Sequence, residues 1–283
     1  MPIQLENVSY VYMEGSTLSN RAVADVSLTI QPGEFIGLIG RTGSGKSTLV
    51  QLMGGLLQPT SGRVLIDGLD MADKKQRVKA RGSIGLVFQY PEYQLFEETV
   101  AKDVAYGPRN MGLDEDVIQG RVRRALELVG LAQDKFGDKS PFELSGGEKR
   151  RAALAGVIAM EPRYLVLDEP MAGLDPVGRS AILATIDGLR EKTGCAVVMV
   201  SHSMEDVARC AGRIAVLKDG KLMFAGSPGE VFCHGEELRS MDLDLPAACK
   251  LVEALRRRGM EVPSLYDMDS LAAFLLERRG SHV

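Results

Sequence analysis

The sequence predicts an α/β fold with a largely parallel sheet, and two observations support this prediction. First, four short runs are continuously apolar, which is typical of parallel strands that helices cover on both faces. Second, a glycine-rich loop follows the first run and precedes an apolar helical stretch, in the order strand, loop, helix. The four runs are EFIGLI (34–39), IGLVF (84–88), YLVLD (164–168) and AVVMV (196–200).

Strands of a second kind are expected outside this core. ADVSLTI (24–30) and RVLIDG (63–68) alternate apolar and polar residues, which is the period of half-exposed strands. RIAVLKDGKLMFAG (213–226) predicts a hairpin, because Asp219 and Gly220 supply the two residues of a tight turn between apolar strands.

The C-terminal part of the chain has a helical pattern instead. After about Pro228, apolar residues recur at intervals of three and four, which predicts amphipathic helices. We therefore divide the chain into a main domain at 1–227 and a helical C-terminal region at 228–283. The two apolar sets are Ala248, Leu251, Val252 and Leu255, and then Leu271, Phe274 and Leu275.

Composition excludes several classes of protein. The chain has 283 residues, with 34 Lys and Arg against 38 Asp and Glu, so its formal net charge is −4 and nucleic acid is not expected as its partner. No uncharged apolar run approaches the roughly 20 residues that a membrane-spanning helix needs. The first residues, MPIQLENVSY, lack the charged and apolar segments of a secretory signal, so we expect a cytosolic location.

The glycine-rich loop has the spacing of a phosphate-binding loop. GRTGSGKST (40–48) matches G-x-x-x-x-G-K-[ST] between a strand and a helix. Lys46 would reach the β- and γ-phosphates of a nucleotide, and the Ser47 hydroxyl would ligate Mg²⁺. The residues expected to surround the phosphates are Gly40, Arg41, Thr42, Gly43, Ser44, Gly45, Lys46, Ser47 and Thr48.

Two adjacent carboxylates follow another apolar strand. RYLVLDE (163–169) places Asp168 and Glu169 at the carboxyl edge of the sheet, where parallel sheets bind their ligands. Asp168 can hold Mg²⁺ through a water molecule, and Glu169 can polarise a water that attacks the γ-phosphate.

Further motifs give a family resemblance. LSGGE (144–148) resembles the signature sequence of the ABC ATPases, which is usually LSGGQ. The chain also matches the positions that the family calls Q-loop, D-loop and H-loop, and the resemblance covers 3–227 almost without interruption. These positions are Gln89 after IGLVF, Asp175 after EPMAGL and Ser201-His202 after AVVMV.

The resemblance implies a fold and two ligands. The fold is an ABC ATPase cassette, with a RecA-like parallel core, an antiparallel β subdomain and a helical subdomain that carries the signature, followed here by the helical C-terminal region. The ligands are ATP and Mg²⁺, with Ser47, Gln89 and Asp168 at the metal. Tyr12 matches the aromatic residue that stacks on adenine, and Tyr10 is the competing candidate.

The resemblance also implies that catalysis belongs to a head-to-tail dimer, in which the signature of one chain faces the phosphate loop of the other. Glu169 and His202 would then order the attacking water, with His202 touching the γ-phosphate, and Asp175 would link the two sites. The signature residues that would bind the γ-phosphate of the partner's nucleotide are Ser145, Gly146, Gly147 and Glu148.

The chain departs from the family pattern at Glu148, where Gln is more usual. Ser145-Gly-Gly-Glu148 has the S-x-x-E form of a capping box, in which the Ser145 hydroxyl and the Glu148 carboxylate each bond to the backbone N–H of the other residue. A carboxylate at this position also suits the helix dipole. We therefore expect a capped helix to begin at the signature.

The segment FQYPEYQLFEETVAKDVAYGPRN (88–110) resembles the ATPases of energy-coupling factor transporters, in particular their second ATPase type. The resemblance implies a peripheral subunit on the cytoplasmic face of the membrane. It would power uptake of a vitamin or metal ion through separate membrane-embedded subunits, together with a second ATPase subunit as a homodimer or heterodimer. The alternatives are another type of ABC importer and a soluble ABC ATPase without transport.

Two parts of the chain are candidates for contact with partners. We expect the residues after Gln89 to form a groove for short helices of a membrane subunit, with Tyr93, Leu95 and Phe96 as apolar anchors if they are exposed. The 228–283 region resembles the region that energy-coupling factor ATPases use for contact between their ATPase subunits. A helical pair packed on its own main domain is the alternative interpretation.

Overall fold

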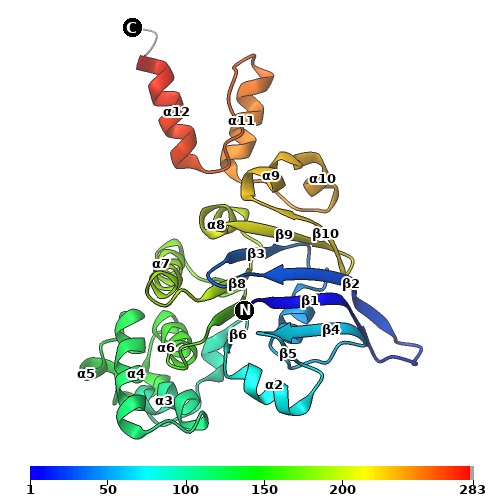
Figure 1. The fold of residues 1–283 in the computed structure, drawn as a ribbon. Coiled ribbons are helices and arrows are strands. Elements are labelled where there is room, and N and C mark those ends of the chain that lie inside the picture. The colour runs from blue at the N-terminus through cyan, green and yellow to red at the C-terminus, as the bar shows by residue number, and fades with distance from the viewer. Residues whose placement is uncertain (281–283) are drawn as a thin grey trace.

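The computed structural model describes residues 1–280, and its main body contains two sheets (Figure 1). The larger sheet has the strand order β10-β9-β3-β8-β7-β6, and all of its neighbouring pairs are parallel except β9 with β10. This arrangement confirms the predicted parallel core and the predicted hairpin. The strands are β3 (Phe35–Ile39), β6 (Ile84–Val87), β7 (Tyr164–Asp168), β8 (Ala196–Val200), β9 (Arg213–Lys218) and β10 (Lys221–Gly226).

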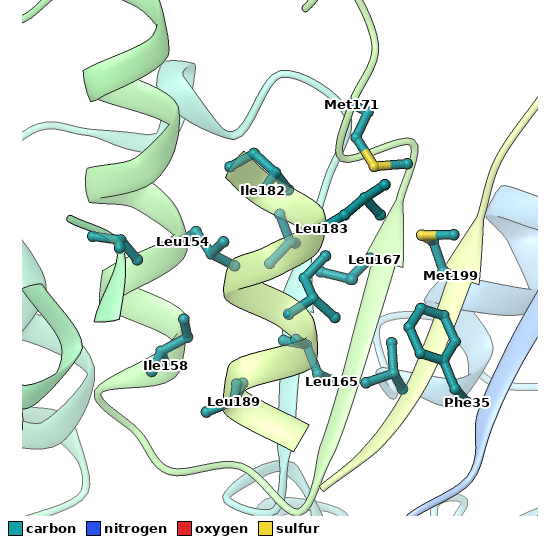
Figure 2. Close-up of a cluster of buried hydrophobic side chains, with 14 of the residues drawn as sticks. Phe35, Leu154, Ile158, Leu165, Leu167, Met171, Ile182, Leu183, Leu189 and Met199 are labelled. Carbon is teal, nitrogen blue, oxygen red and sulfur yellow. The ribbon is translucent and has the colours of Figure 1, made fainter. Parts of the chain in front are cut away.

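The central strands are apolar throughout because helices cover both of their faces. In β7, Leu165 and Leu167 join the same hydrophobic cluster as residues of α7 (Pro176–Thr193), whereas Val166 joins a second cluster with residues of α1 (Lys46–Met53). Figure 2 shows the first cluster, in which the side chains of β7 lie against α7. Each such fully buried side chain stabilises the fold by about 1.5–3 kcal/mol relative to an exposed one.

The smaller sheet is antiparallel, with the order β2-β1-β4-β5, and it covers α1 from the other side through the second cluster. The strand expected at 63–68 ends at Ile66. Asp67 and Gly68 have φ angles of 54° and 80° and form a tight turn into β5. The strands are β1 (Ile3–Tyr12), β2 (Asn20–Ile30), β4 (Ser61–Ile66) and β5 (Leu69–Asp70).

A helical subdomain is inserted between β6 and β7, and α6 is its central helix, with contacts to α3, α4 and the short turn η1. It forms the green lower left part of Figure 1, and the signature lies at the beginning of α6. The helices between β4 and β7 are α2 (Lys74–Arg81), η1 (Pro91–Gln94), α3 (Val100–Asn110), α4 (Glu115–Leu128), α5 (Gln133–Phe136), η2 (Pro141–Glu143) and α6 (Gly146–Ile158).

After β10, the described residues up to 280 contain four helices, and they fall into two groups. Phe232 of α9 and Leu238 of α10 belong to the main hydrophobic cluster, whereas Val252 of α11 and Leu271 of α12 belong to a small cluster of their own. Figure 1 shows α11 and α12 projecting away from the main body. The four helices are α9 (Pro228–Cys233), α10 (Gly235–Ser240), α11 (Ala247–Arg257) and α12 (Met268–Gly280).

The register of the large sheet determines where the site lies. Val200 at the end of β8 pairs with both Leu38 of β3 and Asp168 of β7. The segments that follow these three strands therefore leave the sheet side by side at its carboxyl edge. Within residues 1–280, no helix combines the length and the apolar character that crossing a membrane requires.

Candidate functional site

The phosphate loop connects β3 to α1, and its backbone requires glycine. Gly43 and Gly45 have φ angles of 82° and 98°, a conformation that other residues rarely adopt. A Cβ on Gly45 would also lie 2.2 Å from the Ala22 carbonyl oxygen. Gly45 caps α1 without a side-chain hydrogen bond, so the first N–H groups of this helix are left for an anion.

Lys46 lies inside the loop. Its Nζ donates hydrogen bonds to the carbonyl oxygens of Gly40 at 2.7 Å and Arg41 at 2.9 Å. Burial lowers the pKa of Lys46, and the negative charges of Glu169 and Asp168 partly oppose this effect. The loop therefore holds a buried ammonium group with acceptors on one side and two carboxylates nearby.

Asp168 is a buried carboxylate with an unused oxygen. Its Oδ1 has no hydrogen-bond partner, and the residue is 7% exposed. Burial raises the pKa of Asp168, while a hydrogen bond from Ser47 acts in the opposite direction. An unpaired buried carboxylate oxygen beside a serine hydroxyl is the type of donor set that Mg²⁺ prefers, so these residues fit the expected metal ion.

Glu169 is held between two side chains that are distant in the sequence. Its Oε1 lies 2.7 Å from Nε2 of His202, and its Oε2 accepts a hydrogen bond from Nε2 of Gln89 at 3.3 Å. The φ of Glu169 is 50°, a strained conformation for a residue with a side chain, at the turn that follows β7. The fold thus brings the predicted carboxylate, imidazole and amide together at one point.

Tyr12 and Tyr10 differ in their surroundings. The Tyr12 hydroxyl lies 3.2 Å from the hydroxyl of Thr48 at the beginning of α1, and the Tyr12 ring is 37% exposed. Tyr10 packs against the second hydrophobic cluster and meets the Tyr12 ring edge to face at 4.8 Å. Tyr12 is therefore the better placed of the two to stack on a base above the phosphate loop.

The signature forms the predicted capping box at the beginning of α6. The Ser145 N–H donates to Glu148 Oε2 at 2.8 Å, and the Glu148 N–H donates to Ser145 Oγ at 3.3 Å. These hydrogen bonds lower the pKa of Glu148. Gly146 and Gly147 expose their backbone, since a Cβ would meet nothing within 4 Å on Gly146 and only the end of the Arg151 side chain on Gly147.

Three parts of the predicted site lie apart from the Glu169 cluster or have another contact: the signature, Asp175 and Arg41. Among the residues that the structure describes, no hydrogen bond or ion pair joins 144–148 to the phosphate loop. Asp175 caps α7, and its Oδ1 accepts a hydrogen bond from the Gly178 N–H at 2.7 Å. The Arg41 side chain forms an exposed ion pair at 3.2 Å with Asp242, which lies between α10 and α11.

A groove is formed in part by the segment after Gln89, where we expected one. It has a volume of about 650 Å³ and is lined by residues of α2, α3, α6 and the segment after Gln89. Tyr93 and Phe96 are 84% and 58% exposed, but Leu95 is 8% exposed and belongs to the main core. Of the three candidate anchors, Tyr93 and Phe96 are exposed, whereas Leu95 belongs to the core, which was the alternative interpretation, although it also lines the groove.

The sequence reasoning also missed a buried pair between α6 and η1, the turn whose last residue lines this groove. Arg150 of α6 binds Glu92 of η1 through two hydrogen bonds of 3.0 and 2.8 Å, although the residues are 58 positions apart. The chain contains many arginines and glutamates, and no local pattern marks these two. A glutamate that directly follows Pro91 at the start of a turn is the nearest available signal.

The sequence comparisons with known proteins all indicate the same family. The sequence pattern of the ABC transporter family matches residues 23–172, more than half of the chain. Energy-coupling factor transporter ATP-binding protein EcfA2 of Symbiobacterium thermophilum is 54% identical over 96% of this chain and 95% of its own. EcfA2 of Caldanaerobacter subterraneus subsp. tengcongensis is 50% identical over 93% of this chain and 92% of its own.

Solved structures agree with the fold. The structure of cbiO1 from Clostridium perfringens, described as part of the ABC transporter complex cbiONQ, has a TM-score of 0.74 and 38% identity, covering 89% of this chain and 98% of that chain. The ATP-binding cassette MJ0796, in a dimeric post-hydrolysis state with ADP and Pi, has a TM-score of 0.71 and 31% identity over 80% of this chain and 98% of its own.

The site and these similarities define the class of protein. The chain belongs to the family of ABC transporter ATP-binding proteins, in the group that serves energy-coupling factor transporters. It is an ATPase whose ATP hydrolysis is coupled to transport, and its fold is the ABC ATPase cassette. The predicted family, fold class and activity are confirmed.

Proposed function

We propose that this chain binds and hydrolyses ATP between itself and a second ATPase subunit and drives uptake of a vitamin or metal ion through membrane-embedded subunits. In this proposal it is a peripheral protein of the cytoplasmic membrane face. The observation that carries the proposal is the Glu169 carboxylate, which is held by His202 at 2.7 Å and Gln89 at 3.3 Å beside the phosphate loop. Two fixed partners orient this carboxylate toward one water position.

The residues around the nucleotide have separate roles in the proposal. The N–H groups at the start of α1 and the Lys46 ammonium bind the phosphates, and the Tyr12 ring stacks on the adenine. Glu169 accepts a proton from, or orients, the attacking water, and His202 keeps Glu169 in position and faces the γ-phosphate. The 43% exposure of the His202 side chain supports this role, because the ring remains accessible to a ligand.

Mg²⁺ has a matching set of residues in this chain. Ser47 and Asp168 would hold the ion, with the Gln89 amide as a further oxygen ligand, and the unpaired Asp168 Oδ1 supports this assignment. When bound, Mg²⁺ neutralises charge on the β- and γ-phosphates. In its absence, burial of Asp168 without a cation is unfavourable, which is the physical cause of its raised pKa.

The signature acts on the partner's nucleotide in this proposal. Gly146 and Gly147 present an uncrowded helix tip, and the phosphate loop of the same chain is not within its hydrogen-bonding reach in the described residues. A second ATPase subunit arranged head to tail would supply the missing phosphate. Asp175, at the beginning of α7, would lie at the junction between the two subunits.

In this proposal the groove and the C-terminal region contact other subunits of the transporter. We assign the groove beside Phe96 and Tyr106 to short helices of a membrane subunit, since these two rings stack edge to face at its rim and both are largely exposed. We propose 1–227 as the ATPase domain and 228–283 as an element of contact with the second ATPase subunit. The cluster shared by α11 and α12, separate from the main core, supports a contact element in the later part of this region, whereas α9 and α10 at its start pack into the main core.

The test of the proposal is Glu169→Gln in the complex co-purified with its native partners. Glutamine preserves the shape of the side chain but cannot take a proton, so ATP binding should persist while turnover falls by roughly two or more orders of magnitude. Binding is measured with a fluorescent ATP analogue, and turnover by phosphate release. Normal hydrolysis in this variant would remove Glu169 from the catalytic role.

A further inference from the structure

Arg150 is a buried arginine whose N–H donors and planar guanidinium face are engaged in several directions. Its Nε donates to Glu92 Oε2 at 3.0 Å and its Nη2 donates to Glu92 Oε1 at 2.8 Å. Its Nη1 donates to the carbonyl oxygen of Ala172 at 2.6 Å, and the guanidinium lies 5.8 Å from the centre of the Tyr90 ring. The residue is 4% exposed.

The partners of Arg150 belong to segments that have different tasks. Glu92 and Tyr90 lie just after Gln89, and Glu92 belongs to η1, whose last residue Gln94 lines the groove. Ala172 lies between Glu169 and Asp175. Arg150 itself is on α6, the helix that begins at the signature. One guanidinium group therefore connects η1, whose last residue Gln94 lines the groove, with the segment that follows the catalytic carboxylate and with the signature helix.

A contribution to fold stability does not explain the buried Arg150–Glu92 pair well. A buried ion pair recovers little more than the cost of removing its two charges from water, and a hydrophobic pair of similar size often stabilises a fold equally well. The planar fork of arginine does fix direction, because two parallel hydrogen bonds allow one orientation of the carboxylate. The pair is thus better suited to holding Glu92 at one position than to increasing stability.

We propose that Arg150 is a positioning residue, which sets the segment 89–92 and the segment 169–175 against the signature helix so that a shift at the groove changes the geometry around Glu169. The proposal rests on the catalytic role assigned to Glu169 above. Gln89 and Tyr90 are adjacent, so a displacement of Tyr90 or Glu92 pulls on the amide that bonds to Glu169. A displacement of about 1 Å at a reacting group can lower the rate about 100-fold.

The test uses Arg150→Lys and Glu92→Gln in the co-purified complex. Lysine keeps the positive charge but loses the fork, and glutamine keeps the shape of Glu92 but loses its charge. Both variants should lower kcat for ATP hydrolysis about tenfold or more and change KM for ATP less than about threefold, because Arg150 makes no hydrogen bond to the phosphate loop in the described residues. The double variant should be no worse than the more impaired single variant.

Arg121→Lys is the matched control. Arg121 is a partly buried arginine of the same subdomain, and it binds a carboxylate oxygen of Glu161 at 2.9 Å and a backbone carbonyl, that of Met160, at 3.1 Å. Arg121 lies on α4 and, in the described residues, forms no hydrogen bond or ion pair with residues 89–92 or 169–175, so its replacement should leave kcat unchanged. Rates are expressed per chain that binds the fluorescent ATP analogue, which corrects for any misfolded fraction.

The outcomes separate this inference from the proposed function. Unchanged kcat in both Arg150→Lys and Glu92→Gln, or an equal loss in Arg121→Lys, would overturn the positioning role. If Arg150→Lys fails to fold, Glu92→Gln decides alone, because it removes the charge while preserving the volume. Abolished turnover in Glu169→Gln together with normal turnover in the Arg150 and Glu92 variants would refute this inference and leave the proposed function intact.

Discussion

The beginnings of α1 and α6 differ in how their backbone N–H groups are used. The first four N–H groups of a helix have no partner inside the helix. At α1, the N-cap is Gly45 and contributes no side-chain hydrogen bond, so all four remain for the phosphates of a nucleotide. At α6, the capping box occupies the N–H groups of Ser145 and Glu148 and leaves those of Gly146 and Gly147.

The difference explains how each end can serve as part of an anion site. The α1 end, with Lys46 as its first residue, is built for a multiply charged ligand that stays bound. The α6 end is already balanced by the Glu148 carboxylate, so it needs no ligand to be stable. A γ-phosphate from a second subunit could use the two glycine N–H groups, and its loss on hydrolysis would leave α6 capped and intact.

Lys46→Ala tests whether the α1 end binds the phosphates, and it should have the largest effect of the variants proposed here. The variant loses the buried ammonium group that the loop holds with two carbonyl oxygens, and we expect nucleotide-induced dimerisation to disappear. Sedimentation of the chain with and without Mg-ATP measures the effect. An unchanged dimer in the variant would contradict the assignment of Lys46 to the phosphates.

Asp168→Asn tests the charge that lies beside α1. Since burial raises the pKa of Asp168, its folded form favours the proton, and the ionised side chain destabilises the nucleotide-free chain at neutral pH. The variant should therefore melt about 2–4 °C higher at pH 7, as expected for about 1 kcal/mol. The gain should vanish below about pH 4, where the carboxyl is protonated in both the folded and the unfolded chain. Mg²⁺-dependent hydrolysis should fall about 100-fold.

Asp67→Asn is the control for this experiment. The Asp67 side chain is also 7% exposed, but it accepts the Tyr164 hydroxyl at 2.6 Å and pairs with Arg163. Its replacement should lower the melting temperature, because the negative charge that pairs with Arg163 is removed. A lower melting temperature in both variants would mean that the Asp168 charge does not destabilise the nucleotide-free chain.

These local features explain how much of the site the sequence predicts. The phosphate loop and the capping box each lie within ten residues, so their residue types and spacing nearly define their geometry. The continuous apolar runs predict β3, β7 and β8 because five consecutive buried residues require cover on both faces. Parallel pairing then brings Asp168 and the segment after β8 to one edge.

The features that the sequence does not predict depend on packing between distant segments. The pairing of Arg150 with Glu92 exists because α6 lies against η1, and no periodicity in either segment indicates this contact. Leu95 is buried although its neighbours are exposed, since an irregular segment has no repeating face. In the same way, the helical pattern after Pro228 does not reveal that α9 and α10 join the main core while α11 and α12 do not.

Glu148→Gln tests whether the Glu148 carboxylate only caps α6, and it should have the smallest effect on ATP turnover. A glutamine oxygen can also accept the Ser145 N–H, so the capping box persists, and we expect ATP turnover within about threefold of the original and a melting temperature within about 2 °C at pH 7. At acid pH the stability of the variant should differ from that of the original chain. The lowered pKa of Glu148 means that its contribution is present above about pH 4.3 and is lost as pH falls through the lowered value. The variant should therefore lose less stability in acid.

Ser145→Ala separates capping from contact with the phosphate. It removes the hydroxyl that accepts the Glu148 N–H, which should cost about 1 kcal/mol and lower the melting temperature by about 2–4 °C. If Glu148 only caps α6, Glu148→Gln changes neither melting at neutral pH nor turnover, while Ser145→Ala changes melting. A large gain or loss of turnover in Glu148→Gln with unchanged melting would instead mean that the carboxylate acts directly on the partner's γ-phosphate. The opposed use of the α1 and α6 ends would then no longer hold.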